Sequence, residues 1–153
     1  MTIALVDTSV FCNYLKVPGR DQDAEAIIEK YEFYVSEKVN LLLPIATILE
    51  TGNHIAHIPN GQARRQTAIH FTNEVQKALD SKFPWAVPQP LLEPETLRQY
   101  LADFPDRAMR GISLGDLSII QEYERQCDLH RDRRIFIWSL DADLRGYDRP
   151  AKL

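Results

Sequence analysis

The sequence has few cysteines, no long apolar run and no excess of positive charge. Cys12 and Cys127 lie in apolar helical patterns and offer neither a disulfide framework nor metal-binding spacing, which favours a reducing, cytoplasmic setting. No apolar run approaches the roughly 20 residues needed to cross a bilayer, so we expect no membrane insertion. We also expect no signal peptide, because the chain leads from Met1 straight into a strand-like run.

The charge balance is acidic, with 22 Asp and Glu against 18 Lys and Arg and a formal net charge of -4. This balance does not exclude a nucleic-acid enzyme, because binding depends on local basic patches and bound cations offset clustered acids. The arginines form several such candidate patches, Arg64 with Arg65, Arg107 with Arg110, and Arg131 with Arg133 and Arg134. Each is also explained by an ordinary solvated surface.

Short apolar runs alternate with helical periodicity along the chain. The patterns predict strands at 3–6, 41–43, 86–88 and 135–138, and helices at 9–16, 22–37, 47–57, 61–81, 95–103, 114–130 and 142–146. Such alternation is typical of a parallel sheet flanked by helices. With 153 residues and no internal repeat, we expect one α/β domain over residues 1–153.

Two aspartates follow apolar strand-like runs at opposite ends of the chain. Asp7 ends the run Ile3-Ala4-Leu5-Val6, and Asp141 follows the run 135–138. If the two strands are parallel neighbours, these carboxylates approach each other at the sheet edge where ligands bind, and they repel unless a cation or a proton intervenes. The alternative for Asp7 is a simple turn residue.

Two further acids belong to predicted helices. Asp116 lies four residues before Ile120, so the helical period places it on or beside the apolar face of its helix. Ser113 is placed to cap this helix. The alternative is that Asp116 is simply an acid favoured near a helix N-terminus by the helix dipole. Glu50 follows Thr47 by three residues, so it either faces a site or completes a capping box with Thr47. Oxygen ligands without a cysteine or histidine cluster favour magnesium or manganese over zinc.

His54 and His57 share a helical stripe with Glu50, yet their spacing does not match a zinc helix and no third nitrogen or sulfur ligand is evident. We interpret both as solvated side chains. Ser9 follows Asp7 by two residues, where its hydroxyl is placed either to bond the carboxylate or to cap the next helix, and Thr8 is also placed to cap that helix.

These motifs together resemble the PIN-domain ribonuclease family. The likeness rests on Val6-Asp7-Thr8-Ser9-Val10, a helical Glu50, Ser113-Leu114-Gly115-Asp116 and Ser139-Leu140-Asp141-Ala142-Asp143, in that order. It covers essentially the whole chain and extends, in size, to the single-domain VapC-type toxins of toxin-antitoxin pairs. The chain departs from the family pattern at Ser139, where threonine is frequent, and at Leu144, where an aromatic residue is common.

The resemblance implies a PIN-like domain that cleaves RNA by hydrolysis, leaving a 5′-phosphate and a 3′-hydroxyl. It implies that Asp7, Glu50, Asp116 and Asp141 are catalytic and hold Mg2+ or Mn2+, with Asp143 as a supporting ligand. Ser9 and Ser139 would then be positioning residues. Arg107 and Arg110 lie just before the Asp116 helix, so we expect them near the mouth of the site, where they would contact RNA. By the same likeness the partners are an RNA substrate, a cognate antitoxin protein and a second copy of the chain.

Two other functions compete with this hypothesis. A metal-dependent phosphatase can also use a strand-terminal aspartate, but the phosphatase and receiver folds considered place a second acid beside it and a lysine downstream, and neither is evident here. A PIN-like scaffold that binds RNA or protein without cleaving it is the alternative outside enzymology, and the presence of all four acids argues against it.

Overall fold

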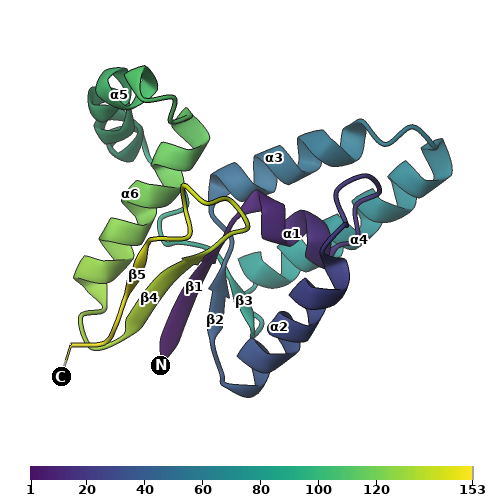
Figure 1. Ribbon diagram of the computed structural model, residues 1–153, viewed down its shortest axis with the longest axis horizontal. Coiled ribbons are helices and arrows are strands. Elements are labelled where there is room, and N and C mark those ends of the chain that lie inside the picture. Colours follow the sequence, from purple (N-terminus) through teal and green to yellow (C-terminus); the bar gives the residue numbers. More distant parts are fainter. Residues whose placement is uncertain (153) are drawn as a thin grey trace.

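The computed structural model describes residues 1–152, which form six helices and a five-stranded sheet (Figure 1). The strands are β1 (Thr2–Val6), β2 (Asn40–Leu42), β3 (Trp85–Ala86), β4 (Arg134–Trp138) and β5 (Asp148–Arg149). The helices are α1 (Thr8–Tyr14), α2 (Ala24–Ser36), α3 (Ile45–Ala56), α4 (Gly61–Leu79), α5 (Pro94–Met109) and α6 (Leu114–Leu129). The predicted α/β class, with helices around a central sheet, is confirmed.

The sheet has the strand order β3-β2-β1-β4-β5. All pairings are parallel except β4 with β5, which is antiparallel. β1 is the central strand because β2 and β3 lie on one side of it and β4 and β5 on the other. The parallel pairings are possible because helices return the chain to the same edge of the sheet before each parallel strand begins. Figure 1 shows the amino ends of β1 and β4 at the bottom of the view and their carboxyl ends pointing to the centre of the molecule.

Alternate residues of the central strands enter two separate cores, as the two-residue period of a strand requires. Ala4 and Val6 of β1 pack in one core with α1 and α2, whereas Ile3 and Leu5 pack on the opposite face with Ile119 of α6. Both faces of the sheet are therefore covered, which explains why β1 and β4 are almost continuously apolar. Within residues 1–152 no helix is apolar and long enough to cross a bilayer.

The structure differs from the predictions near the C-terminus in two ways. Residues 142–146 form turns instead of a short helix, and the chain then continues into β5, which the sequence patterns did not predict. β5 is held by the antiparallel ladder to β4 and by the bond from the Ile137 backbone N–H to the Tyr147 carbonyl, 2.9 Å. The helix predicted at 95–103 is longer than expected and continues through Pro105 to Met109.

Candidate functional site

Asp7 and Asp141 lie at the same edge of the sheet. Their strands are parallel neighbours, with Val6 paired to Trp138, and the Asp7 backbone N–H extends the ladder to the Trp138 carbonyl at 3.0 Å. From β1 the chain builds β2 and β3 on one side, and β4 adds to the other side. This reversal of strand order is the point at which open α/β sheets bind ligands. The predicted approach of the two strand ends is confirmed.

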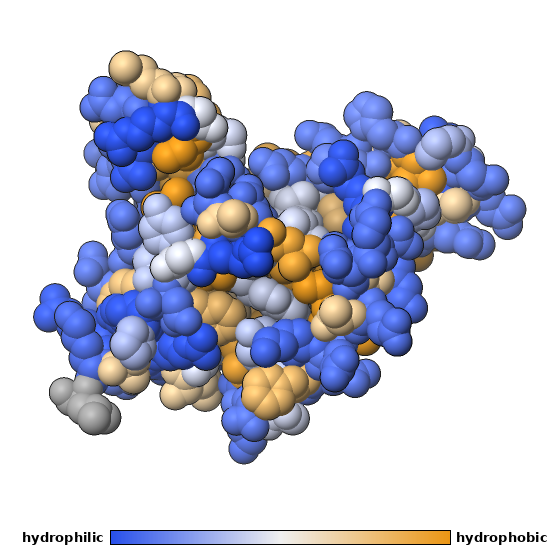
Figure 2. Space-filling view, in the orientation of Figure 1, coloured by the Kyte–Doolittle hydropathy of each residue, from blue (hydrophilic) through white to orange (hydrophobic). Residues whose placement is uncertain are grey.

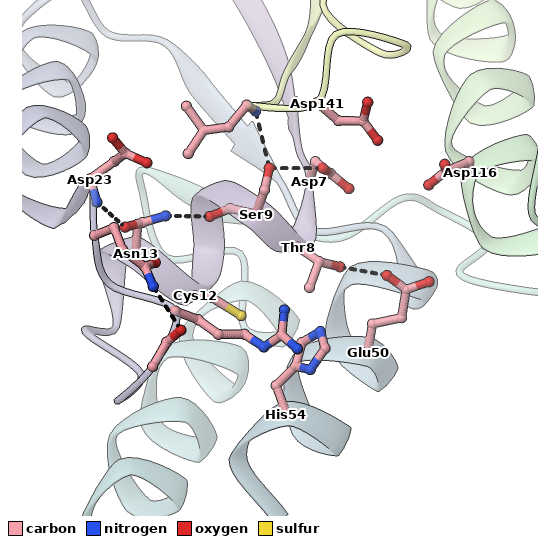
Figure 3. Close-up of a pocket in the computed structure, with 14 residues that line it drawn as sticks. Asp7, Thr8, Ser9, Cys12, Asn13, Asp23, Glu50, His54, Asp116 and Asp141 are labelled. Atoms are coloured by element: carbon pink, nitrogen blue, oxygen red, sulfur yellow. Dashed lines mark hydrogen bonds between the residues drawn. The ribbon is translucent and has the colours of Figure 1, made fainter. Parts of the chain in front are cut away.

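Two helices bring the other acids to this edge. Glu50 lies in the first half of α3, and Asp116 lies in the first turn of α6, where the Ser113 side chain caps the helix by accepting from the Asp116 backbone N–H at 3.0 Å. The predicted cap at Ser113 is therefore confirmed. In Figure 3 the carboxylates of Asp7, Glu50, Asp116 and Asp141 face a common space, although they come from four separate segments.

This space belongs to a cleft of about 440 Å³. The cleft is lined by Asp7, Thr8, Ser9, Cys12, Asn13, Gly19, Arg20, Gln22, Asp23, Glu50, His54, Asp116, Leu140 and Asp141. All four acids selected from the sequence are thus brought together. Asp143 is not among the lining residues; it lies with Asp116 in a neighbouring hollow.

Two serine hydroxyls hold the buried carboxylate of Asp7. Ser9 Oγ donates to Asp7 Oδ2 at 2.9 Å, and Ser139 Oγ donates to the same oxygen at 2.7 Å. Each serine also accepts a backbone N–H from the loop after β4, Ser9 from Leu140 at 3.0 Å and Ser139 from Asp141 at 2.9 Å. The serines therefore join the loop after β4 to the carboxylate that follows β1. Capping by Ser9 was the alternative, and it is wrong.

The loop after β4 distinguishes Asp141 from Asp143. Asp141 Oδ1 accepts the backbone N–H of Asp143 at 2.9 Å, a local turn that fixes the Asp141 side chain. Asp141 faces the cleft, whereas Asp143 approaches Asp116 from the adjoining hollow. Both residues are exposed.

Glu50 is free to face the cleft because Thr47 is not a cap. α3 begins two residues earlier than predicted, with Pro44 at the N-cap, and buried Thr47 donates its hydroxyl to the Val6 carbonyl at 2.7 Å. The proposed capping box is therefore wrong, since Thr47 joins α3 to the end of β1. Glu50 Oε2 instead accepts from Thr8 Oγ1 at 2.9 Å (Figure 3), a role for Thr8 that the sequence analysis missed.

Gly115 permits the close approach of α6 to α3. A Cβ atom at this position would collide with Glu50 Oε1 and would also contact Ala46. The absence of a side chain therefore keeps the Glu50 carboxylate beside the first turn of α6. This is a physical reason for the glycine directly before Asp116.

The pKa of Asp116 is raised from 3.8 to about 6, first by burial and then by the negative charges of Asp7, Asp141, Glu50 and Asp143. Each of these neighbours disfavours ionisation of Asp116 because like charges repel. Among residues 1–152, no ion pair involves Asp7, Glu50, Asp116 or Asp141. The cluster therefore has excess negative charge that a cation would offset.

His54 lines the cleft, a position that the sequence analysis did not predict. Its side chain is half-buried on α3, one turn after Glu50, and its pKa is lowered by burial first and by the charge of Arg20 next. His57 is exposed, as expected. Arg20, in the turn between α1 and α2, was not identified from the sequence because an exposed arginine beside a glycine carries no distinguishing pattern.

The two arginines predicted to contact RNA have different surroundings. Arg107 forms an ion pair with Asp103 on its own helix, with Nε and Oδ2 3.2 Å apart. Arg110 is exposed at the end of α5 and lines the hollow that also contains Asp116 and Asp143. Arg110 is therefore beside the acids, and Arg107 already has a carboxylate partner.

Within residues 1–152, no three His, Cys, Asp or Glu side chains stand in a ready-made metal-binding arrangement. The chain was also compared with known proteins. No protein-family model matches it, and searches of curated protein sequences and of solved structures find no significant match.

Proposed function

We propose that this chain is a metal-dependent endoribonuclease that hydrolyses RNA phosphodiester bonds, as its resemblance to the PIN-domain family implies. The observation that carries the proposal is the convergence of Asp7, Glu50, Asp116 and Asp141 on one cleft with no cationic partner for any of them in residues 1–152. Acids collected in this way are costly to the fold unless a ligand neutralises them.

The donor set fits Mg2+ or Mn2+. Every candidate ligand is a carboxylate, and these ions favour oxygen donors and retain several waters, so direct coordination by three side chains is not required. Asp7, Glu50, Asp116 and Asp141 would hold the ion, and Asp143 would support it from the adjoining hollow. When bound, the ion supplies Lewis-acid activation of water and neutralises charge at the phosphate.

The chain's own residues organise the reaction. Ser9 and Ser139 fix the orientation of Asp7, and Thr8 fixes that of Glu50, so the carboxylates are set before substrate arrives. A water attacks phosphorus, the bond to the 3′ oxygen breaks, and that oxygen takes up a proton. The products are a 5′-phosphate and a 3′-hydroxyl.

The role as a toxin is proposed from the resemblance and the chain's size. It adds a cognate antitoxin that blocks the acidic cleft, a homodimer, and action in the cytoplasm. Light scattering of the purified protein tests the dimer. Expression of the chain alone in growing cells tests toxicity, because a freely tolerated, high-yield active protein would contradict a toxin.

The nuclease is tested by incubating a labelled mixed RNA pool with Mn2+ or Mg2+, with a chelator control. Asp141→Asn and Asp143→Asn form a matched pair, since both alter an exposed acid of the same loop by one charge. We expect metal-dependent cleavage that Asp141→Asn reduces more than Asp143→Asn. Release of phosphate from small esters without RNA cleavage would support the phosphatase, and RNA binding without turnover would support the scaffold.

A further inference from the structure

The cleft also contains a positive charge. Besides Asp7, Glu50, Asp116, Asp141 and a further acid, Asp23, its lining includes Arg20 and His54. The positive charge of Arg20 acts to lower the pKa of both His54 and Cys12. Burial is the largest effect on each: it also lowers the pKa of His54, but it raises the pKa of Cys12, whose net shift is upward. The charge of Arg20 is therefore close enough to act on two other residues of the cleft lining.

The turn that carries Arg20 is anchored to the acidic side. Gly19 adopts a φ of +85°, and the Arg20 backbone N–H donates to the Val17 carbonyl at 2.9 Å. Buried Asn13 closes the far end of the turn, accepting the Asp23 N–H at 2.9 Å and donating to the Ser9 carbonyl at 2.8 Å (Figure 3). Arg20 is thus connected through α1 to the serine that holds Asp7.

The guanidinium of Arg20 is exposed, and it is in none of the ion pairs formed within residues 1–152. Other arginines, such as Arg125 and Arg134, do have carboxylate partners there. A free guanidinium beside a cleft matches the geometry of a phosphate, which it binds through two parallel N–H bonds. His54 has a lowered pKa and is neutral at pH 7, so it adds a hydrogen-bonding ring without repelling Arg20.

We propose that Arg20, with His54 beside it, binds a backbone phosphate next to the phosphate that is cleaved. This inference rests on the proposed nuclease function and makes it more specific, because the substrate must then carry at least two phosphates along one strand. An ester with a single phosphate reaches the acids alone and lacks the contact with Arg20. The arrangement thus favours polynucleotides over small phosphate esters.

The test uses a synthetic oligoribonucleotide whose cleavage position by the wild-type protein has been mapped. Wild type, Arg20→Ala and Arg98→Ala are compared for kcat/KM and, in chelator, for binding by fluorescence anisotropy. Arg98 is an exposed arginine of α5 that does not line the cleft. Loss of a charge-assisted phosphate contact predicts a roughly ten- to hundredfold fall in kcat/KM and weaker binding for Arg20→Ala only.

A second measurement identifies the phosphate. Neutral methylphosphonate groups replace the flanking phosphates one at a time. At one position the wild type should lose as much activity as Arg20→Ala does on ordinary RNA, and Arg20→Ala should lose little more. Equal losses for Arg20→Ala and Arg98→Ala, or additive losses at every position, would overturn the assignment while leaving the nuclease intact. A wild-type protein that neither binds nor cleaves RNA would overturn both proposals.

Discussion

Buried acids occur in two regions of this molecule and have different hydrogen-bond partners in each. Glu122 of α6 accepts two bonds from Arg125, at 2.7 and 3.0 Å, and one from Gln126 Nε2 at 2.8 Å. Asp7 is equally buried, but its side chain receives only the hydroxyls of Ser9 and Ser139. The first carboxylate is neutralised within the fold, and the second is oriented but remains uncompensated.

This difference separates acids that the fold compensates from acids that it leaves uncompensated. A paired buried carboxylate has its charge balanced and needs no ligand, whereas an oriented, unpaired cluster raises the free energy of the empty protein and is stabilised when a cation binds. Figure 2 shows hydrophilic side chains over most of the viewed face, so surface polarity alone would not single out the cleft. The cleft is distinguished by the lack of a cationic partner for its acids.

The largest expected effect is on turnover at the unpaired acids. Asp116→Asn should lower RNA cleavage at least about a hundredfold, because it removes a charge from the proposed cation site. The melting temperature without metal should not fall. Asp128→Asn, an exposed acid near the other end of α6, is the control and should retain activity. Similar activity in Asp116→Asn and Asp128→Asn would show that an unpaired acid of the cleft matters no more for cleavage than an exposed acid outside it.

The next effect is on stability at the paired acid. Arg125→Ala should lower the free energy of unfolding by about 2 kcal/mol, since it leaves the Glu122 carboxylate, whose side chain is 7% exposed, without its cation. Urea denaturation measures this change. Arg98→Ala breaks an ion pair whose side chains are both 77% exposed, and it should cost no more than about 0.5 kcal/mol. Equal losses would show that burial does not matter at Glu122.

A smaller effect is expected where α6 approaches α3. Gly115→Ala should displace the Glu50 carboxylate and weaken its bond from Thr8, because the new methyl group collides with Glu50 Oε1. We expect roughly a tenfold fall in cleavage, the order of loss when a ligand's supporting contact is removed. Folding should be retained, because the colliding atom is the end of a flexible side chain. Gly146→Ala is the control, since its Cβ meets open space. Full activity in Gly115→Ala would separate Glu50 from the site.

The parallel sheet and the four acids could be predicted because each depends on a local pattern. Apolar runs alternate with helical periods, and Asp7 and Asp141 directly follow such runs. The role of Thr47 could not be predicted, because Thr47 and Glu50 satisfy the capping pattern and only a bond to the Val6 carbonyl, 41 residues away, overrides it. β5 was missed for a similar reason: Asp148 and Arg149 have no apolar pattern, and their pairing with β4 defines the strand.

The smallest expected effect concerns the pH dependence of the metal-free protein. The pKa of Asp116 is about 6 when folded and 3.8 ordinarily, so between these values the folded protein holds a proton that the unfolded chain has lost. Raising the pH through this window therefore lowers the free energy of unfolding. The stability that protonated Asp116 contributes is complete below about pH 3.8 and is lost above about pH 6. Asp116→Asn should have a flatter profile in urea titrations between pH 4 and 7. Mn2+ should raise the melting temperature of the wild type at pH 7 more than that of the variant, because the ion relieves the same repulsion. Parallel pH profiles and equal responses to Mn2+ would mean that Asp116 is as well compensated as Glu122.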